Sequence, residues 1–183
     1  MDFGNSIKQA IEIVKLNGKA AVAVSKDKKA TLIGILIIAI GAVLSQILSF
    51  EIGTMIFTLM VLIMGYFIIV GVMHALALLF GGKAKYMEYF RAESYSSILG
   101  WLGALALVPF LGNVISLLVS IWGIVVSVVI LENVHKLTRR NAVIVVLIPV
   151  IISILLIVIG SAAYFGAVSP EAFGTLSPEA LLP

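Results

Sequence analysis

His74 is the one ionisable side chain that this sequence places well inside a long apolar stretch, seven residues before the glycine pair Gly81-Gly82 that ends it. At 1.5 Å per residue, a helix would set the imidazole roughly 10 Å from that pair. Such a histidine can bind or relay a proton, or it can form a neutral hydrogen bond that packs two helices together. Glu132 and Asn133 are the polar residues expected to approach it, and the sequence leaves both interpretations open.

Other catalytic and ligand-binding patterns are missing from the sequence. Gly82-Lys83 is not a phosphate-binding loop, because Ala84 follows the lysine and Ala77 stands where the first glycine would be. There is no His-Glu-x-x-His motif, no Gly-x-Ser-x-Gly elbow with a usable histidine, and no carboxylate pair within the apolar runs. The chain also has no cysteine and only two histidines. We therefore expect no enzyme activity, catalytic residue, metal or cofactor.

The elements that position His74 must lie in lipid. Hydrophobic residues make up 62% of the 183 residues and charged residues 11%, against roughly 45–50% and about 25% in soluble domains. A soluble core of this size cannot hide so much apolar surface. The first apolar run begins at Ala30 and is longer than the apolar region of a signal peptide, about 7–15 residues. We expect it to remain as a span of an all-α, polytopic membrane protein.

Five apolar runs predict a bundle of five transmembrane helices, because about 17–25 residues cross the hydrocarbon core. The second run is long enough that it must tilt or extend beyond the core. The third and fourth are short and meet at a proline-glycine turn, so a re-entrant hairpin over 95–131 is the alternative to two full spans. The runs cover about 30–49, 54–80, 95–111, 114–131 and 142–166, between an N-terminal segment, 1–29, and a tail, 167–183.

The cationic residues predict the orientation of these spans. All twelve lie in the segments 1–29, 81–93 and 132–141, and none lies in the alternate connections or the tail. By the positive-inside rule the N-terminus is cytoplasmic and the C-terminus outside. The cytoplasmic side then carries twelve cationic and six acidic groups, a net +6, against −3 outside.

The N-terminal segment predicts a short amphipathic helix that ends near Gly18. Ile7, Ile11 and Val14 recur at helical spacing, and Ser6 with Gln9 fits a capping box. This helix would either pack on the cytoplasmic face of the protein or lie on anionic lipid, where each lysine contributes about 1 kcal/mol. The two placements are compatible with each other.

A stripe of small residues runs along the fourth span, at Ser116, Ser120, Gly123 and Ser127. Small residues let membrane helices approach closely, so we expect this stripe to pack against another helix; a polar pore is the alternative. Tyr86, Tyr89 and Phe90 stand among the charges of 81–93. They are candidates for anchors of a binding surface or for an interfacial aromatic belt.

Several of these residues resemble the pattern of the Yip domain family, the Ypt/Rab-GTPase-interacting five-pass membrane proteins. The likeness covers roughly residues 10–165 and rests on soft glycine, aromatic and histidine positions. They are His74 before Gly81-Gly82-Lys83, then Tyr95-Ser96, Pro109, Trp122 and Asn133-Val134-His135-Lys136.

The resemblance implies a role in membrane traffic with a protein partner and no catalytic residues. Eukaryotic members have a long cytoplasmic N-terminal region, so the short lysine-rich start implies a minimal, prokaryote-like member in the plasma membrane, for which a Rab partner is in doubt. The matching positions are His74, Gly81, Gly82, Tyr95, Trp122 and His135, with Glu132 beside the last.

Two classes of function follow from these observations. The favoured one is a non-enzymatic scaffold or adaptor that docks a protein partner, or another copy of itself, on its cytoplasmic face, with anionic lipid beside it. The other is a small transporter or channel with a polar path near His74. No nucleic acid partner is expected.

Overall fold

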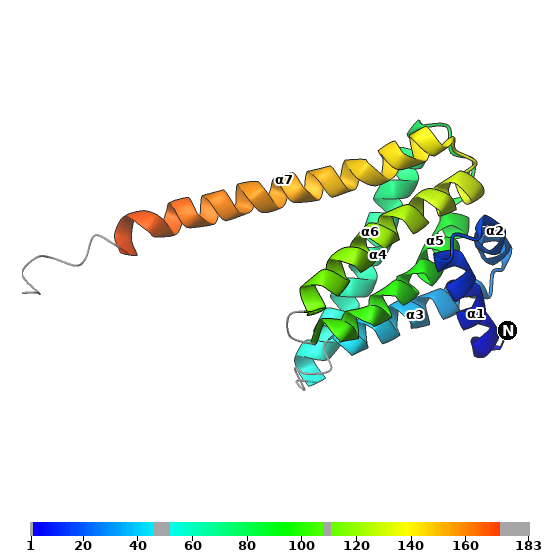
Figure 1. The fold of residues 1–183 in the computed structure, drawn as a ribbon, viewed down its shortest axis with the longest axis horizontal. Coiled ribbons are helices and arrows are strands. Elements are labelled where there is room, and N and C mark those ends of the chain that lie inside the picture. The colour runs from blue at the N-terminus through cyan, green and yellow to red at the C-terminus, as the bar shows by residue number, and fades with distance from the viewer. Residues whose placement is uncertain (1, 46–51, 108–110, 173–183) are drawn as a thin grey trace, which may run out of the picture. The chain divides into compact units, whose positions relative to one another are not determined.

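The computed structural model describes residues 2–45, 52–107 and 111–172 (Figure 1). Every regular element in these ranges is helical and none is a strand, which confirms the all-α prediction. The chain forms two compact units, residues 1–146 and 147–183, and the last helix contributes to both. The elements are α1 (Phe3–Val14), α2 (Gly18–Lys26), α3 (Ala30–Ser45), α4 (Ile52–Leu79), α5 (Tyr86–Ser96), η1 (Ser97–Leu107), α6 (Leu111–Ile130), η2 (Leu131–His135) and α7 (Arg139–Ala172).

Three helical stretches are long and apolar enough to cross a membrane: Ile56–Leu79, Gly112–His135 and Arg139–Ala162. Ala30–Leu44 is a shorter apolar helix. The expected third span is divided between the last residues of α5 and the 3₁₀ helix η1. The five-span count therefore stays a prediction. The connection over 46–51, residues 109 and 110 of the 109–113 turn and the tail after 172 lie outside the described residues.

The N-terminal segment folds into two helices rather than one. Asp2 caps α1 by accepting a hydrogen bond from the Gly4 amide, and the Ser6 hydroxyl donates to the Asp2 carbonyl. The helix therefore begins before the predicted Ser6–Gln9 capping box. Leu16 has a left-handed φ of 68°, and the Asn17 side chain then caps α2. A turn in the left-handed region ends a helix, which is why α1 stops short of Gly18.

The inner face of α1 packs on the protein itself. Its buried residues are Ser6, Ala10 and Ile13, whereas Ile11 is exposed, so the face is rotated by one residue from the predicted one. The Trp122 indole on α6 donates to the Val14 carbonyl at 2.8 Å and ties down the end of this helix. Contact of α1 with lipid stays a prediction, now restricted to its outer face.

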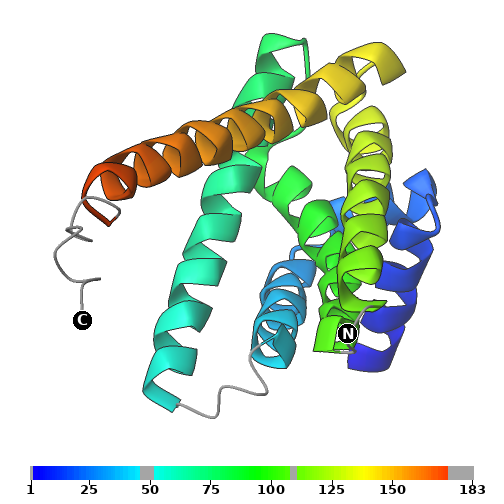
Figure 2. The same cartoon turned by 60° about the vertical axis from the view of Figure 1, so that its left-hand side comes forward.

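Helix α5 lies at the centre of the first unit and packs against α1, α2, α3, α4 and α6 (Figures 1 and 2). Tyr89, Phe90, Ala92 and Tyr95 are fully buried, although they point to different sides of the helix. The Phe90 ring stacks on that of Phe67 in α4, with centroids 4.3 Å apart. The sequence predicts 81–93 as a charged connection between two spans, with its aromatics on a binding surface or in an interfacial belt. The burial of Tyr89 and Phe90 shows that they form neither a surface anchor nor an interfacial belt.

Two glycines allow a direct test of the close packing between α3 and α5. A Cβ at Gly34 would overlap the Ser94 hydroxyl, whereas a Cβ at Gly65 in α4 meets no heavy atom within 4 Å. We expect Gly34→Ala to lower the melting temperature in detergent, because overpacking costs typically 1–3 kcal/mol. Gly65→Ala should leave it unchanged or raise it, since alanine is favoured over glycine in a helix by roughly 0.5–1 kcal/mol. Equal melting temperatures would contradict the described approach of α3 to α5.

Candidate functional site

The hydrogen-bond partner of His74 is the second histidine of the chain. His74 Nδ1 on α4 lies 3.2 Å from His135 Nε2 on η2, and the ring centroids are 5.1 Å apart. Such a bond needs one N–H and one lone pair, so only one of the two facing nitrogens carries a proton. His135 is fully buried. Asn133, one of the two expected neighbours of His74, instead donates to the Val129 carbonyl of its own helix.

The glycine pair makes room for this histidine pair. Gly81 has a φ of 88°, a conformation that favours glycine, and it turns the chain after α4. The Gly82 amide donates to the Ala77 carbonyl at 2.8 Å. A Cβ at Gly82 would lie 2.5 Å from His135 Nδ1, so a larger residue would displace the ring. The Lys83 amide donates to the His135 carbonyl at 3.0 Å and joins the two segments.

The π-helical turn η2 presents His135 to α4. It continues α6 with one wider turn and ends at Lys136, whose φ of 60° is left-handed. Tyr86 and Tyr89 of α5 line the other sides of the pair, with ring centroids 5.6 Å from His74 and 5.0 Å from His135. The Tyr86 hydroxyl donates to the Phe67 carbonyl at 3.0 Å. Each imidazole thus lies against one tyrosine ring, and the site joins three elements distant in sequence, α4, α5 and η2.

A buried carboxylate, Glu93, lies on the same central helix. Its Oε1 accepts a hydrogen bond from the Ser127 hydroxyl of α6 at 2.5 Å, and its main-chain carbonyl accepts one from Tyr66 of α4 at 2.6 Å. Burial raises the pKa of Glu93 to about 7, although the hydroxyl groups of Ser127 and Tyr89 oppose the shift. Burial also raises the pKa of the Tyr89 phenol well above its usual value. Glu93 can therefore exchange a proton near neutral pH.

Sequence reasoning assigned Glu93 to the charged loop and missed it. The available signal was helical spacing: Glu93 follows Tyr89 by four residues and Phe90 by three, so it shares the side of α5 that these aromatics cover. Charged residues are seldom fully buried, which made the solvated interpretation the natural one.

The other predicted positions are dispersed. Tyr95 is buried in α5, Trp122 is 42% exposed and holds α1, and Glu132 is half-buried on η2. Of the small-residue stripe, Ser127 hydrogen-bonds another helix, through Glu93 of α5. Ser116 and Ser120 are exposed, and the Ser120 hydroxyl donates to the Ser116 carbonyl of its own helix. A Cβ at Gly123 meets no heavy atom within 4 Å.

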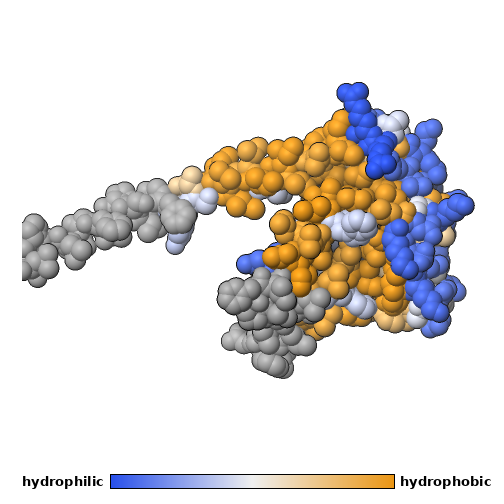
Figure 3. Space-filling model, viewed as in Figure 1, coloured by the Kyte–Doolittle hydropathy of each residue, from blue (hydrophilic) through white to orange (hydrophobic). Residues whose placement is uncertain are grey.

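The arrangement can hold and exchange protons but offers little for other chemistry. No three histidine, cysteine or acidic side chains are gathered as a metal site in the described part of the chain. The hydrophilic surface lies mainly at the end of the first unit that carries α1 and α2, and most of the remaining visible surface is hydrophobic (Figure 3). Eleven of the twelve Lys and Arg side chains are exposed, Arg91 being the half-buried one.

Apolar helices of membrane length, with charged groups gathered apart from them, define an integral membrane protein of the helical class. A family model of the Yip1 domain matches residues 20–160, so this chain belongs to the Yip1 domain family. The match confirms the resemblance found from the sequence. Comparison with curated proteins and with solved structures found no match.

Substitution of His74 tests the hydrogen bond to His135. We expect His74→Gln to be more stable than His74→Leu, because leucine would leave a buried imidazole unpaired at a cost of about 1–3 kcal/mol. The melting temperatures of both variants in detergent measure this difference. A leucine variant as stable as the wild type would show that the bond contributes nothing.

The pKa of Glu93 predicts a pH dependence of stability. The folded protein, with a Glu93 pKa of about 7 against the usual 4.5, binds the proton more tightly than the unfolded chain. The stability it contributes is present below about pH 4.5 and is lost as the pH rises to about 7. The difference is about 3 kcal/mol. Glu93→Gln, which stays neutral, should flatten the fall in melting temperature between pH 5 and pH 8.

Glu132→Gln provides the matched control, because Glu132 is a half-buried carboxylate on η2 that takes no part in the Glu93–Ser127 bond. This variant should keep the wild-type pH dependence. A Glu93→Gln protein whose melting temperature falls as steeply as that of the wild type would refute a titrating Glu93.

Proposed function

We propose that this Yip1-domain protein is a non-enzymatic membrane scaffold or adaptor that docks a protein partner on its cytoplasmic face. In this proposal it is a five-pass protein of a prokaryotic plasma membrane that takes part in membrane organisation or traffic. The N-terminus is cytoplasmic and the C-terminus lies outside. The orientation is supported by the confinement of all twelve cationic residues to 1–29, 81–93 and 132–141.

The observation that carries the proposal is a folded cationic cap, which we define as α1 and α2. The cap packs against α5, α6 and η2 through contacts that hold both helices in place. Asn17 caps α2, and the next residue, Gly18, lies so close to Asn133 that a Cβ would overlap its side chain. A preformed surface loses less conformational freedom on binding than a flexible tail does.

The outer surface of the cap has the composition of a docking face. Phe3 is 42% and Ile11 39% exposed. Lys8 precedes Ile11 by three residues on α1, and Lys15, which caps the end of this helix, follows it by four. Exposed apolar side chains ringed by charge are typical of protein interaction sites. A partner with an acidic rim around an apolar centre would match this face. Phe3 and Ile11 thus take the role that the sequence had assigned to the aromatics of α5.

A crosslinking experiment in native membranes tests this proposal. A photoreactive residue at Lys8 should capture a specific protein, and Phe3→Asn with Ile11→Asn should reduce the yield at least fivefold. Met87→Asn, which changes an exposed apolar side chain on α5, is the matched control and should leave the yield unchanged. Equal yields from both variants would exclude the outer face of α1 as the docking site.

Self-association is the second form of docking and has its own test. Gly123 faces open space within the single chain, so Gly123→Leu should preserve the melting temperature. If α6 mediates the contact between copies, the same variant should reduce crosslinking between them. Ile124→Leu keeps the side-chain volume and should change neither measurement.

The buried polar groups favour one alternative function, a small proton-linked transporter. His74, His135 and Glu93 supply titratable groups, and Tyr66, which bonds Glu93, also lines a cavity of about 260 Å³ with Ile38 and Leu62. Liposome flux that is lost in His74→Leu, with no crosslinked partner in membranes, would replace the scaffold with this alternative.

A further inference from the structure

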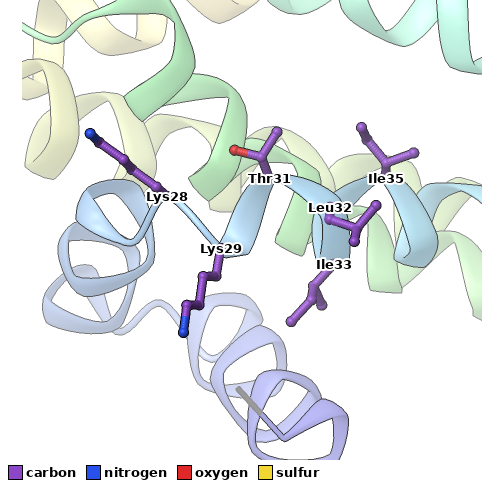
Figure 4. A pocket seen from close by; sticks show the side chains of 6 residues that line it. All are labelled: Lys28, Lys29, Thr31, Leu32, Ile33 and Ile35. Atoms are coloured by element: carbon purple, nitrogen blue, oxygen red, sulfur yellow. The ribbon is translucent and has the colours of Figure 1, made fainter.

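A groove of about 520 Å³ opens at the beginning of α3, where the apolar part of the chain starts (Figure 4). Its walls combine two kinds of side chain. Lys28, Lys29 and Thr31 supply cationic and hydroxyl groups at one end, and Leu32, Ile33 and Ile35 supply apolar groups along the helix. Leu32 is 66% exposed, which is a large apolar area to leave uncovered beside two ammonium groups.

The order of these residues matches the order of groups in a phospholipid. Lys28 and Lys29 lie in the turn before α3, and Thr31, Leu32 and Ile35 follow on its first two turns, so a single molecule lying along α3 meets charge first and hydrocarbon afterwards. Figure 4 shows Lys28 and Lys29 diverging from the start of the helix, with Leu32 farther along it. The ammonium groups can thus approach a headgroup from two sides.

Among the described residues, no ion pair neutralises the positive charge at this end. In the described ranges the one ion pair joins Lys15 to Glu12, away from the groove. Arg91 adds a third cation, since its guanidinium donates to Thr31 Oγ1 at 2.8 Å and to the Ser25 carbonyl at 2.9 Å. Asp27 is the acidic residue nearby, and its carboxylate accepts from the Lys29 amide at 2.9 Å. Lys28, Lys29 and Arg91 thus outnumber the one carboxylate of Asp27 in this part of the chain.

We propose that this groove binds one anionic phospholipid. Lys28 and Lys29 contact the phosphate and headgroup, and the Thr31 hydroxyl, which already accepts from Arg91, donates its proton to a phosphate oxygen. The upper acyl chain lies along Leu32 and Ile35. A free anion would leave the apolar wall uncovered, and an acidic peptide would bring unpaired main-chain groups against it. The site requires only that α3 enters the bilayer, and it does not depend on the docking of a protein partner.

Lipid titration of the full-length, delipidated protein in detergent tests the site. Binding of phosphatidylglycerol and of phosphatidylcholine with the same acyl chains is followed by native mass spectrometry. We expect Lys28→Ala with Lys29→Ala to weaken phosphatidylglycerol binding about 30-fold, which is about 2 kcal/mol for two lysines. Lys83→Ala with Lys85→Ala removes the same charge from exposed positions outside the groove and should weaken it less than about threefold.

Further variants distinguish a phospholipid site from a site that binds only a phosphate group. Thr31→Val conserves shape but removes the hydroxyl, and with it the acceptor of the Arg91 bond, so it should weaken binding several-fold and also lower the melting temperature. Leu32→Gln should weaken binding of the lipid but not that of glycerol phosphate. Equal affinity for both phospholipids, equal losses in the two lysine pairs, or glycerol phosphate that binds as tightly as the lipid would each overturn the proposal. Crosslinking from Lys8 should persist in the Lys28 and Lys29 variant, so the lipid site and the docking of a partner can fail separately.

Discussion

A bilayer offers no hydrogen-bond partners, so polar groups that are drawn toward the apolar part of this protein must find partners within it. Helix α5 meets this constraint for the most polar internal segment of the chain. Its tyrosines, serines and Glu93 lie among α1, α2, α3, α4 and α6, and the bonds from Ser127 and Tyr66 reach it from two different helices. The first unit therefore packs around α5. Because this helix is rich in polar and charged residues, the hydropathy of the sequence does not mark it as a central element.

The sequence was sufficient for features that depend on local composition. Apolar runs of membrane length predicted the helical class, and the glycine pair predicted the end of α4, because Gly81 occupies a conformation that other residues seldom adopt. His74 could also be identified from local composition, because it is an ionisable group with apolar neighbours in the chain.

Features that depend on tertiary contacts could not be predicted in this way. The density of charge in 83–93 is what a solvated loop would show, and the burial of Tyr89 and Glu93 depends on helices that lie far away in sequence. His135 meets His74 only because η2 widens the end of α6 and Gly82 has no side chain. The division of the N-terminal segment depends on a single left-handed residue, Leu16, which has no special sequence signal.

Helix α5 also joins the two regions to which chemistry can be assigned. Arg91 bonds Thr31 at the edge of the groove, and Glu93, two residues later, bonds Ser127 of α6. Two residues in a helix differ in direction by about 200°, so these side chains point to opposite sides of one rigid element. Ser94, the residue after Glu93, fills the space left by Gly34. A displacement of α5 that carried Arg91 away from α3 would necessarily change the surroundings of the Glu93 carboxylate. Coupling between an anionic ligand on α3 and the protonation of Glu93 would require, in addition, a second stable arrangement of this helix.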